Sequence, residues 1–117
     1  MFRCAFCLIF LALCPVVAQA HAFPERSIPR VGRSLAQSPP EVKITFDADL
    51  EPLFSSIVVK NANQIVVSDA ASTVSPTNPR VLSAPLKSLA PGKYYIYWGV
   101  VATDGHRTEG HFPFRIR

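Results

Sequence analysis

The stretch Tyr94-Tyr-Ile-Tyr-Trp-Gly-Val-Val-Ala-Thr-Asp-Gly-His106 contains the clearest strand signal in the chain. Apolar side chains recur at every second position from Tyr94 to Ala102, and this alternation is typical of a half-buried β-strand. The strand then runs into Asp104, Gly105 and His106. Side chains two apart in an extended chain point to the same side, so one carboxylate and one imidazole can face a common point. The stretch therefore predicts a core strand that leads into half of a metal site.

Shorter alternating segments flank this strand and have the same period of two. We expect further strands at residues 42–46, 54–60, 64–67, 80–83 and 112–116. No stretch shows a sustained helical period. Several short strands in fewer than 100 residues predict an all-β fold, a small antiparallel Greek-key β-sandwich of the cupredoxin-like or immunoglobulin-like kind. Its core is expected to contain Trp98, Phe46, Phe54, Phe112 and Phe114.

Residues 1–20 have the pattern of a secretory signal peptide. Arg3 supplies a positive charge, residues 4–13 are almost wholly apolar, and Ala18-Gln-Ala20 has the small-x-small form that signal peptidase cleaves. The apolar run is shorter than the roughly 20 residues that a spanning helix needs. We expect cleavage and no stable insertion into a membrane.

Cleavage at this point would make His21 the first residue of a single exported domain, residues 21–117. A lipoprotein modified at Cys14 is the alternative, although Leu13 is an unfavourable residue just before such a cysteine. The choice matters because only a cleaved chain gives His21 a free α-amine.

All three cysteines and the only methionine fall within residues 1–20, so the rest of the chain contains no sulfur. This excludes from the mature protein disulfides, thiolate catalysis, zinc or iron–sulfur sites with Cys ligands, and blue-copper centres. A metal bound by this chain must accept nitrogen and oxygen ligands.

The charge of the mature chain is small, because eleven Lys and Arg residues stand against eight Asp and Glu residues, 11 − 8 = +3. The basic residues are scattered along the sequence, without the interleaved aromatic residues that bind nucleic acid. We expect no nucleic-acid partner and assign these side chains to a solvated surface.

The segment 21–40 is rich in Pro, Ser and Arg, which opposes a helix and predicts an extended arm against the body of the domain. Its apolar residues are expected to anchor it: Phe23, Ile28, Val31 and Leu35. An anchored arm would fix the position of His21.

An N-terminal His21 offers two nitrogens, its α-amine and its imidazole, which can close a chelate ring on one ion. Together with His106 and Asp104 it gives three nitrogens and one oxygen, a set that suits tetragonal Cu(II). Zinc and nickel stand lower in the affinity order but could occupy it. The residues alone indicate a nitrogen–oxygen metal site.

The chain also resembles a known family in a set of short motifs. They are His21-Ala22, Ser27-x-Pro29, Val42-Lys-Ile-Thr-Phe46, Pro91-Gly92-x-Tyr94-x-Ile96-x-Trp98-x-Val100, Asp104-Gly-His106 and Gly110-x-Phe112-x-Phe114. With these it resembles the CopC family of bacterial periplasmic copper-resistance proteins over essentially all of the mature part.

The resemblance implies a cupredoxin-like sandwich that binds one Cu(II) through the amine and imidazole of His21, the imidazole of His106 and the carboxylate of Asp104. Members with a methionine-rich loop also bind Cu(I). This chain has no methionine after Met1, so it is similar to the Cu(II)-only members. The resemblance further implies a CopD-type inner-membrane copper transporter as partner. We expect a monomer.

Two other classes of function stay open. Copper held by an N-terminal histidine brace also occurs in oxidative polysaccharide-cleaving enzymes, and a β-sandwich can act as a metal-free interaction module. We expect neither, and we assign no catalytic residue. His111 could be a further ligand or could steer a ligand, but an exposed strand histidine is the favoured interpretation.

Overall fold

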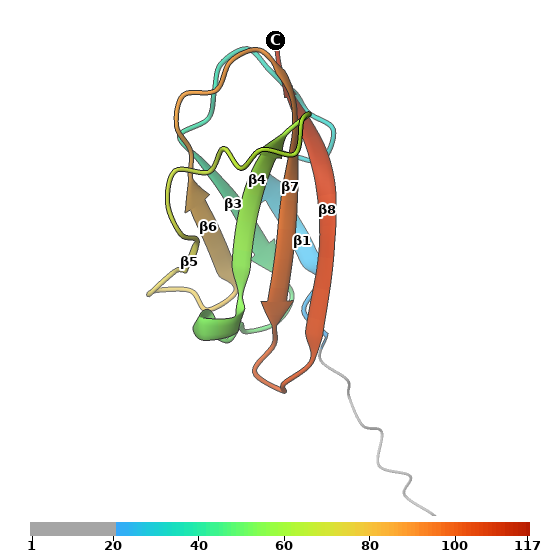
Figure 1. The fold of residues 1–117 in the computed structure, drawn as a ribbon. Coiled ribbons are helices and arrows are strands. Elements are labelled where there is room, and N and C mark those ends of the chain that lie inside the picture. Colours follow the sequence, from blue (N-terminus) through green and yellow to red (C-terminus); the bar gives the residue numbers. More distant parts are fainter. Residues whose placement is uncertain (1–20) are drawn as a thin grey trace, which may run out of the picture.

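The computed structural model describes residues 21–117, so the expected signal peptide lies outside the described part of the chain. Two four-stranded sheets pack face to face (Figure 1). Sheet A contains, in spatial order, β1 (Pro24–Ile28), β3 (Glu41–Phe46), β6 (Val81–Pro85) and β5 (Thr73–Val74). Sheet B contains β2 (Ser34–Leu35), β8 (Arg107–Ile116), β7 (Gly92–Val101) and β4 (Ser56–Asn61). The predicted all-β sandwich is confirmed.

Sheet B is built around a long hairpin. β7 and β8 pair antiparallel along their whole length, from Gly92 opposite Ile116 to Val101 opposite Arg107. The final strand therefore begins at Arg107, five residues before the predicted start. One pairing departs from the expected antiparallel pattern, because β2 runs parallel to β8. Within residues 21–117, no helix is long and apolar enough to cross a membrane.

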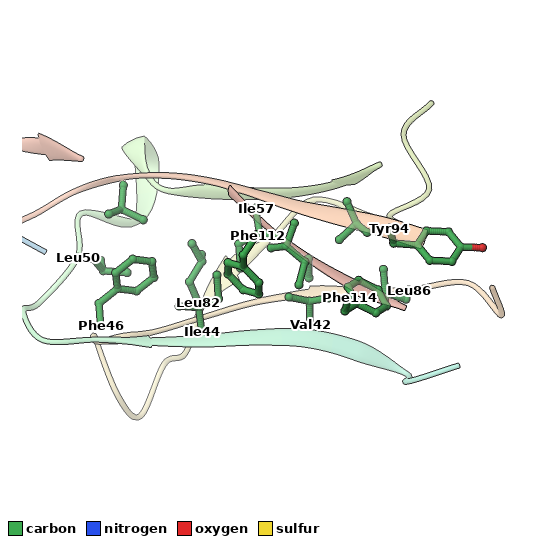
Figure 2. Packing of buried hydrophobic residues seen from close by; sticks show 14 of the residues in the cluster. Val42, Ile44, Phe46, Leu50, Ile57, Leu82, Leu86, Tyr94, Phe112 and Phe114 are labelled. Atoms are coloured by element: carbon green, nitrogen blue, oxygen red, sulfur yellow. The ribbon is translucent and has the colours of Figure 1, made fainter. Parts of the chain in front are cut away.

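The core lies between the two sheets and takes inward side chains from β3, β4, β6, β7 and β8 (Figure 2). Its largest fully buried members are Phe46, Phe114, Ile44, Leu82, Ile96, Val42, Val59 and Val100. Trp98 is half-buried and meets Phe46 edge-on, with ring centroids 5.4 Å apart. Each fully buried aliphatic or aromatic side chain contributes about 1.5–3 kcal/mol relative to exposure, so this layer is the main source of stability.

Phe54 is not in the core, and its prediction as a core residue was wrong. It ends a short 3-10 helix, Pro52–Phe54, and is 63% exposed. The helix begins at a proline, which fixes the backbone angle φ and removes a donor for strand pairing. The strand β4 therefore starts only at Ser56.

The predicted strand at residues 64–67 was also wrong. This segment makes only isolated bridges, such as Lys60 with Val66, after a turn in which the side chain of Asn61 accepts hydrogen bonds from Asn63 and Ile65. The stretch 68–78, in which no strand is predicted, contributes the short strand β5.

The arm lies along the body as expected, but most of the predicted anchors do not hold it. Phe23, Ile28 and Val31 are exposed, whereas Ala22 and Ser27 are buried. The reason is that β1 joins the edge of sheet A by backbone pairing with β3. Backbone hydrogen bonds hold the arm, so its large side chains are left facing water.

Candidate metal centre

The two C-terminal strands of sheet B present the candidate ligands at the turn that joins them. Ala102 donates its N–H to the carbonyl of His106 at 3.0 Å, and Gly105 donates to the carbonyl of Ala102 at 2.8 Å. Gly105 has a φ of +89°, a conformation that residues with a Cβ adopt only with strain. This tight turn brings Asp104 and His106 to the same side at the end of the hairpin, as the sequence predicts.

Asp104 and His106 contact each other twice. The backbone N–H of His106 donates to Oδ1 of Asp104 at 3.0 Å, and Nδ1 of His106 lies 3.0 Å from Oδ2. The His106 N–H is the main cause that holds the pKa of the Asp104 carboxyl below its ordinary value, and the His106 side chain adds to it. The side chains are 29% and 52% exposed, so the pair is accessible to an incoming ion.

His21 is far from this pair in the sequence but lies beside it in the fold. Its imidazole ring lies 5.0 Å from the ring of His106, with the two planes tilted by 58°. Figure 1 shows the reason, since the chain around residue 21 lies beside the lower end of β8, next to the β7–β8 turn. The structure therefore brings all three sequence-predicted ligands into one neighbourhood.

The position of His21 is fixed by the two residues that follow it. Ala22 is fully buried, and its carbonyl accepts a hydrogen bond of 2.5 Å from the hydroxyl of Thr108. Phe23 donates its N–H to Oδ1 of Asp47 at 2.7 Å and accepts from the Asp47 N–H at 3.0 Å. We call these contacts of Thr108 and Asp47 the arm clamp.

Sequence reasoning missed the arm clamp. Asp47 belongs to the acidic patch Asp47-Ala-Asp-Leu-Glu51 directly after β3, and neither it nor Thr108 is among the predicted site residues. The signal for it in the sequence was a polar residue directly after a buried strand, because such side chains often form hydrogen bonds with nearby backbone groups. Asp49 in the same patch instead holds Arg80, with Oδ1 3.1 Å from Nε.

His111 lies away from this neighbourhood. Its ring stacks on Tyr97, with centroids 5.3 Å apart, on the outward side of sheet B. Five residues of extended strand separate it from His106, about 17 Å at the usual rise. The structure therefore places it as an exposed strand histidine.

One metal ion requires its donor atoms to lie at particular distances from one another. Neighbouring ligands in a square arrangement, with bonds of about 2.0–2.1 Å, lie about 2.9 Å apart. The Nδ1 of His106 and the Oδ2 of Asp104 are 3.0 Å apart, which fits. Among residues 21–117, however, no three His, Cys, Asp or Glu side chains form a ready-made metal cluster. A four-donor site here needs the α-nitrogen of His21, which is an amide in the uncleaved chain.

The sequence of the domain matches a known protein family. A family model described as the CopC domain matches residues 24–117. The chain belongs to the CopC family. The match includes Asp104 and His106 and begins just after His21, so the predicted resemblance is confirmed over nearly the whole domain.

Relatives of this CopC-family chain include proteins named for copper. The copper transport protein CutJ of Bacillus subtilis (strain 168) is 32% identical over 110 residues, which is 93% of this chain but only 20% of CutJ. The chain thus spans about a fifth of that relative. The protein YobA of Escherichia coli (strain K12) is 26% identical over 116 residues, covering 98% of this chain and 94% of YobA.

Solved structures agree with the family assignment. The crystal structure of CopC from Methylosinus trichosporium OB3b matches with a TM-score of 0.77 and 30% identity, over 82% of this chain and 93% of that one. PcoC, a methionine-rich copper resistance protein from Escherichia coli, matches with a TM-score of 0.65 at 21% identity, over 84% and 100% of the two chains, which shows a shared fold. The CopC domain of this chain is therefore similar both to a region of a copper transport protein and to CopC itself.

Proposed function

We propose that this protein is exported to the periplasm, is cleaved after Ala20, and binds one Cu(II) for copper carriage, homeostasis or resistance. The proposed ligands are the α-amine and imidazole of His21, the carboxylate of Asp104 and the imidazole of His106. The observation that carries the proposal is the 5.0 Å approach of the His21 ring to His106, which is itself paired with Asp104.

The chemistry of the donors supports Cu(II) as the cargo. No sulfur is available after residue 20, so soft Cu(I) has no thiolate or thioether ligand in the mature chain. Nitrogen donors in a tetragonal set favour Cu(II), which stands above zinc and nickel in the affinity order. The arm clamp supports the proposal further, because it holds the start of the arm beside the turn that carries the other ligands.

Binding would be coupled to protons. An amine and an imidazole coordinate a metal only through an unprotonated nitrogen, so copper displaces the protons that these groups carry. We expect the apparent affinity for Cu(II) to fall as the solution is acidified.

The proposed partner is a copper transporter of the inner membrane, of the CopD type. Its support is the likeness to CutJ, a copper transport protein in which the matched region is one fifth of the length. We propose that this partner performs the transport itself and that the 21–117 domain is a monomeric carrier.

The test begins with the N-terminus. The protein is expressed with its own leader, its intact mass is measured, and the same sample is titrated with Cu(II) while its EPR spectrum is recorded. We expect a chain that begins at His21 and binds one equivalent with a nitrogen-rich tetragonal signal. Both His21→Ala and His106→Ala should lose this signal, whereas His111→Ala, the matched control, should retain it.

Two results would overturn the proposal. One is a mature chain that begins at Cys14 or still carries residues 1–20, because its His21 would have no free amine. The other is an unchanged copper signal in the two ligand variants. An ascorbate-driven oxidation assay on the copper-loaded protein tests the binding role separately, since clear turnover of a polysaccharide would make the protein an enzyme.

A further inference from the structure

The outward side of sheet B gathers basic and aromatic residues that are far apart in the sequence. Paired residues on antiparallel strands share a face, and β7–β8 pairing sets Lys93 opposite Arg115 and Tyr97 opposite His111. The strand β4 adds Lys60 opposite Tyr95. We call this surface the basic face and define it by Lys60, Lys93, Tyr95, Tyr97, Arg107 and Arg115. In Figure 1 it belongs to the layer of β4, β7 and β8.

The basic face carries the whole net charge of the mature domain. It has four cations, and its one acidic residue, Glu109, lies 3.7 Å from Arg107. The domain has eleven Lys and Arg residues and eight Asp and Glu residues, so seven of each remain elsewhere and cancel. The charges of the basic face therefore sum to +3, and those of the rest of the mature domain sum to zero.

The centre of the basic face is aromatic. The ammonium group of Lys60 lies 5.0 Å from the ring centre of Tyr97, and that of Lys93 lies 5.3 Å from the ring centre of Tyr95. Val66, which bridges to Lys60 at the edge of β4, is 56% exposed and extends the apolar part. Tyrosines with an apolar ring and a polar tip, surrounded by lysines, are typical of a membrane–water interface.

Arg107 is held on the same surface. It lies so close over Gly99 that a Cβ there would be 2.4 Å from its Nη2 atom. Beside it is a hollow of about 380 Å³ whose lining includes Ser56 and Tyr97. The guanidinium is thus directed across the sheet, toward the other cations and away from the candidate metal ligands.

We propose that the basic face docks this protein onto an anionic phospholipid bilayer. The cations are spread over a sheet face and do not converge on one point. This arrangement suits the extended negative surface of a membrane better than a single acidic group. A sheet face also presents side chains and no unpaired backbone, so it offers no strand-pairing site for a peptide. Docked in this way, the β7–β8 turn with Asp104 and His106 would lie at the rim of the contact, open to neighbouring molecules.

The experiment measures binding of the 21–117 domain, which contains every buried core residue of the described structure, to lipid vesicles. Sedimentation with vesicles of phosphatidylcholine and phosphatidylglycerol is compared with pure phosphatidylcholine at low and high salt. The test variant combines Lys60→Gln, Lys93→Gln and Arg115→Gln. The control variant combines Arg26→Gln, Lys43→Gln and Lys87→Gln, which removes the same charge from positions outside the basic face.

We expect the unmodified domain to bind the anionic vesicles and to be released by salt. Each basic residue near an anionic surface strengthens partitioning about fivefold at low salt, so the test variant should bind roughly a hundredfold more weakly. The control variant should lose only a small part of that. All six positions are on the surface, so both variants should keep their melting temperature.

Three outcomes would overturn the proposal. The unmodified domain could fail to bind anionic vesicles at low salt, or the two variants could lose binding equally, which would show a response to net charge alone. The third is tighter binding to soluble polyglutamate than to the vesicles, which would make an acidic protein the partner of the basic face. None of these depends on copper, so they are independent of the proposed metal site.

Discussion

At the scale of single residues, the start of the arm decides whether the candidate ligands can meet. His21 is placed by the residues after it, because Ala22 is buried and its carbonyl is held by Thr108, while Phe23 is held by Asp47. A ligand on a tethered backbone loses less freedom when it binds than a ligand on a loose end. The contacts of Thr108 and Asp47 should therefore influence copper affinity without touching the ion.

The first prediction concerns Thr108. Replacing it with Val keeps the shape but removes the hydroxyl that donates to the Ala22 carbonyl, so the arm should be held less firmly. A hydrogen bond contributes about 0.5–1.5 kcal/mol, so its loss should weaken copper binding by about 2–10-fold. Competition titration against a Cu(II) chelator measures the change. Thr108→Ser retains the hydroxyl and should stay near the original affinity; equal affinities for all three proteins would contradict the role of the clamp.

The second prediction concerns Asp104 and pH. Its carboxyl has a lowered pKa in the fold because the His106 N–H, and then the His106 side chain, favour the charged form. A group with a lowered pKa stabilises the folded state above its ordinary value of about 3.9, and this stabilisation is lost as pH falls through the lowered pKa. In metal-free urea unfolding, Asp104→Asn should be slightly less stable at neutral pH.

In strong acid, below the lowered pKa, the difference between Asp104→Asn and the original protein should vanish. Glu25→Gln serves as a control on another exposed carboxylate. A stability difference that stays constant down to strong acid would show that the charge of Asp104 contributes nothing to folding.

At the scale of elements, the β7–β8 hairpin unites the core and the candidate site. Its inward side chains fill the sandwich, its outward ones form the basic face, and its turn carries Asp104 and His106. The inward side includes an aromatic ring lying over a glycine. A Cβ at Gly110 would be 2.7 Å from Cζ2 of Trp98, its partner on β7.

The third prediction follows from this close approach. Gly110→Ala should push the Trp98 ring out of its place against Phe46 and destabilise the domain by about 1–3 kcal/mol, as overpacking usually does. Thermal or urea unfolding measures the effect. Glu109→Ala, one residue away on the outward side, should change stability by no more than about 0.5 kcal/mol. A stability of Gly110→Ala equal to that of the control would show that the ring has another place to go.

At the scale of the whole molecule, the candidate site combines residues from the N-terminal arm with residues from the C-terminal hairpin. The arm pairs with sheet A through β1, whereas Asp104 and His106 belong to the hairpin of sheet B. A metal ion bound to both would link the sheets and favour the folded state over the unfolded one by mass action.

The fourth prediction is that Cu(II) raises the melting temperature of the 21–117 domain. At a free concentration 100 times the dissociation constant, the added stability is about 2.7 kcal/mol, which corresponds to a shift on the order of 10 °C for a domain of this size. A chain that begins at Ala22 lacks the proposed chelate but keeps the arm clamp, so it should show a much smaller shift. Equal shifts in both chains would place the copper elsewhere.

Much of the fold could be predicted from local pattern. The alternation from Tyr94 to Ala102 predicted β7 and its buried side, because a period of two is a property of the strand itself. The prediction that Phe54 is a core residue failed because the proline two residues earlier begins a helical turn, which the apolar pattern does not reveal. The predicted strand at residues 64–67 does not form, because a strand also needs a continuous pairing partner, which a local pattern does not show.

The chemistry of the ligands was also present in the sequence. A chain without sulfur after residue 20 limits a metal to nitrogen and oxygen donors wherever the fold places them, and family resemblance pointed to His21, Asp104 and His106. Their assignment as copper ligands stays a prediction. What the sequence determined by itself was therefore the strand periodicity and the kind of donor atoms, because both are properties of the residues themselves.

Only the tertiary structure decided which distant residues meet. It brought the His21 ring to His106, showed that Thr108 and Asp47 hold the arm in place of the expected apolar anchors, and gathered scattered lysines and arginines on the basic face. The physical reason is that these contacts depend on strand register and on how two sheets pack. Both are set by the burial of the whole core, which no local stretch of sequence contains.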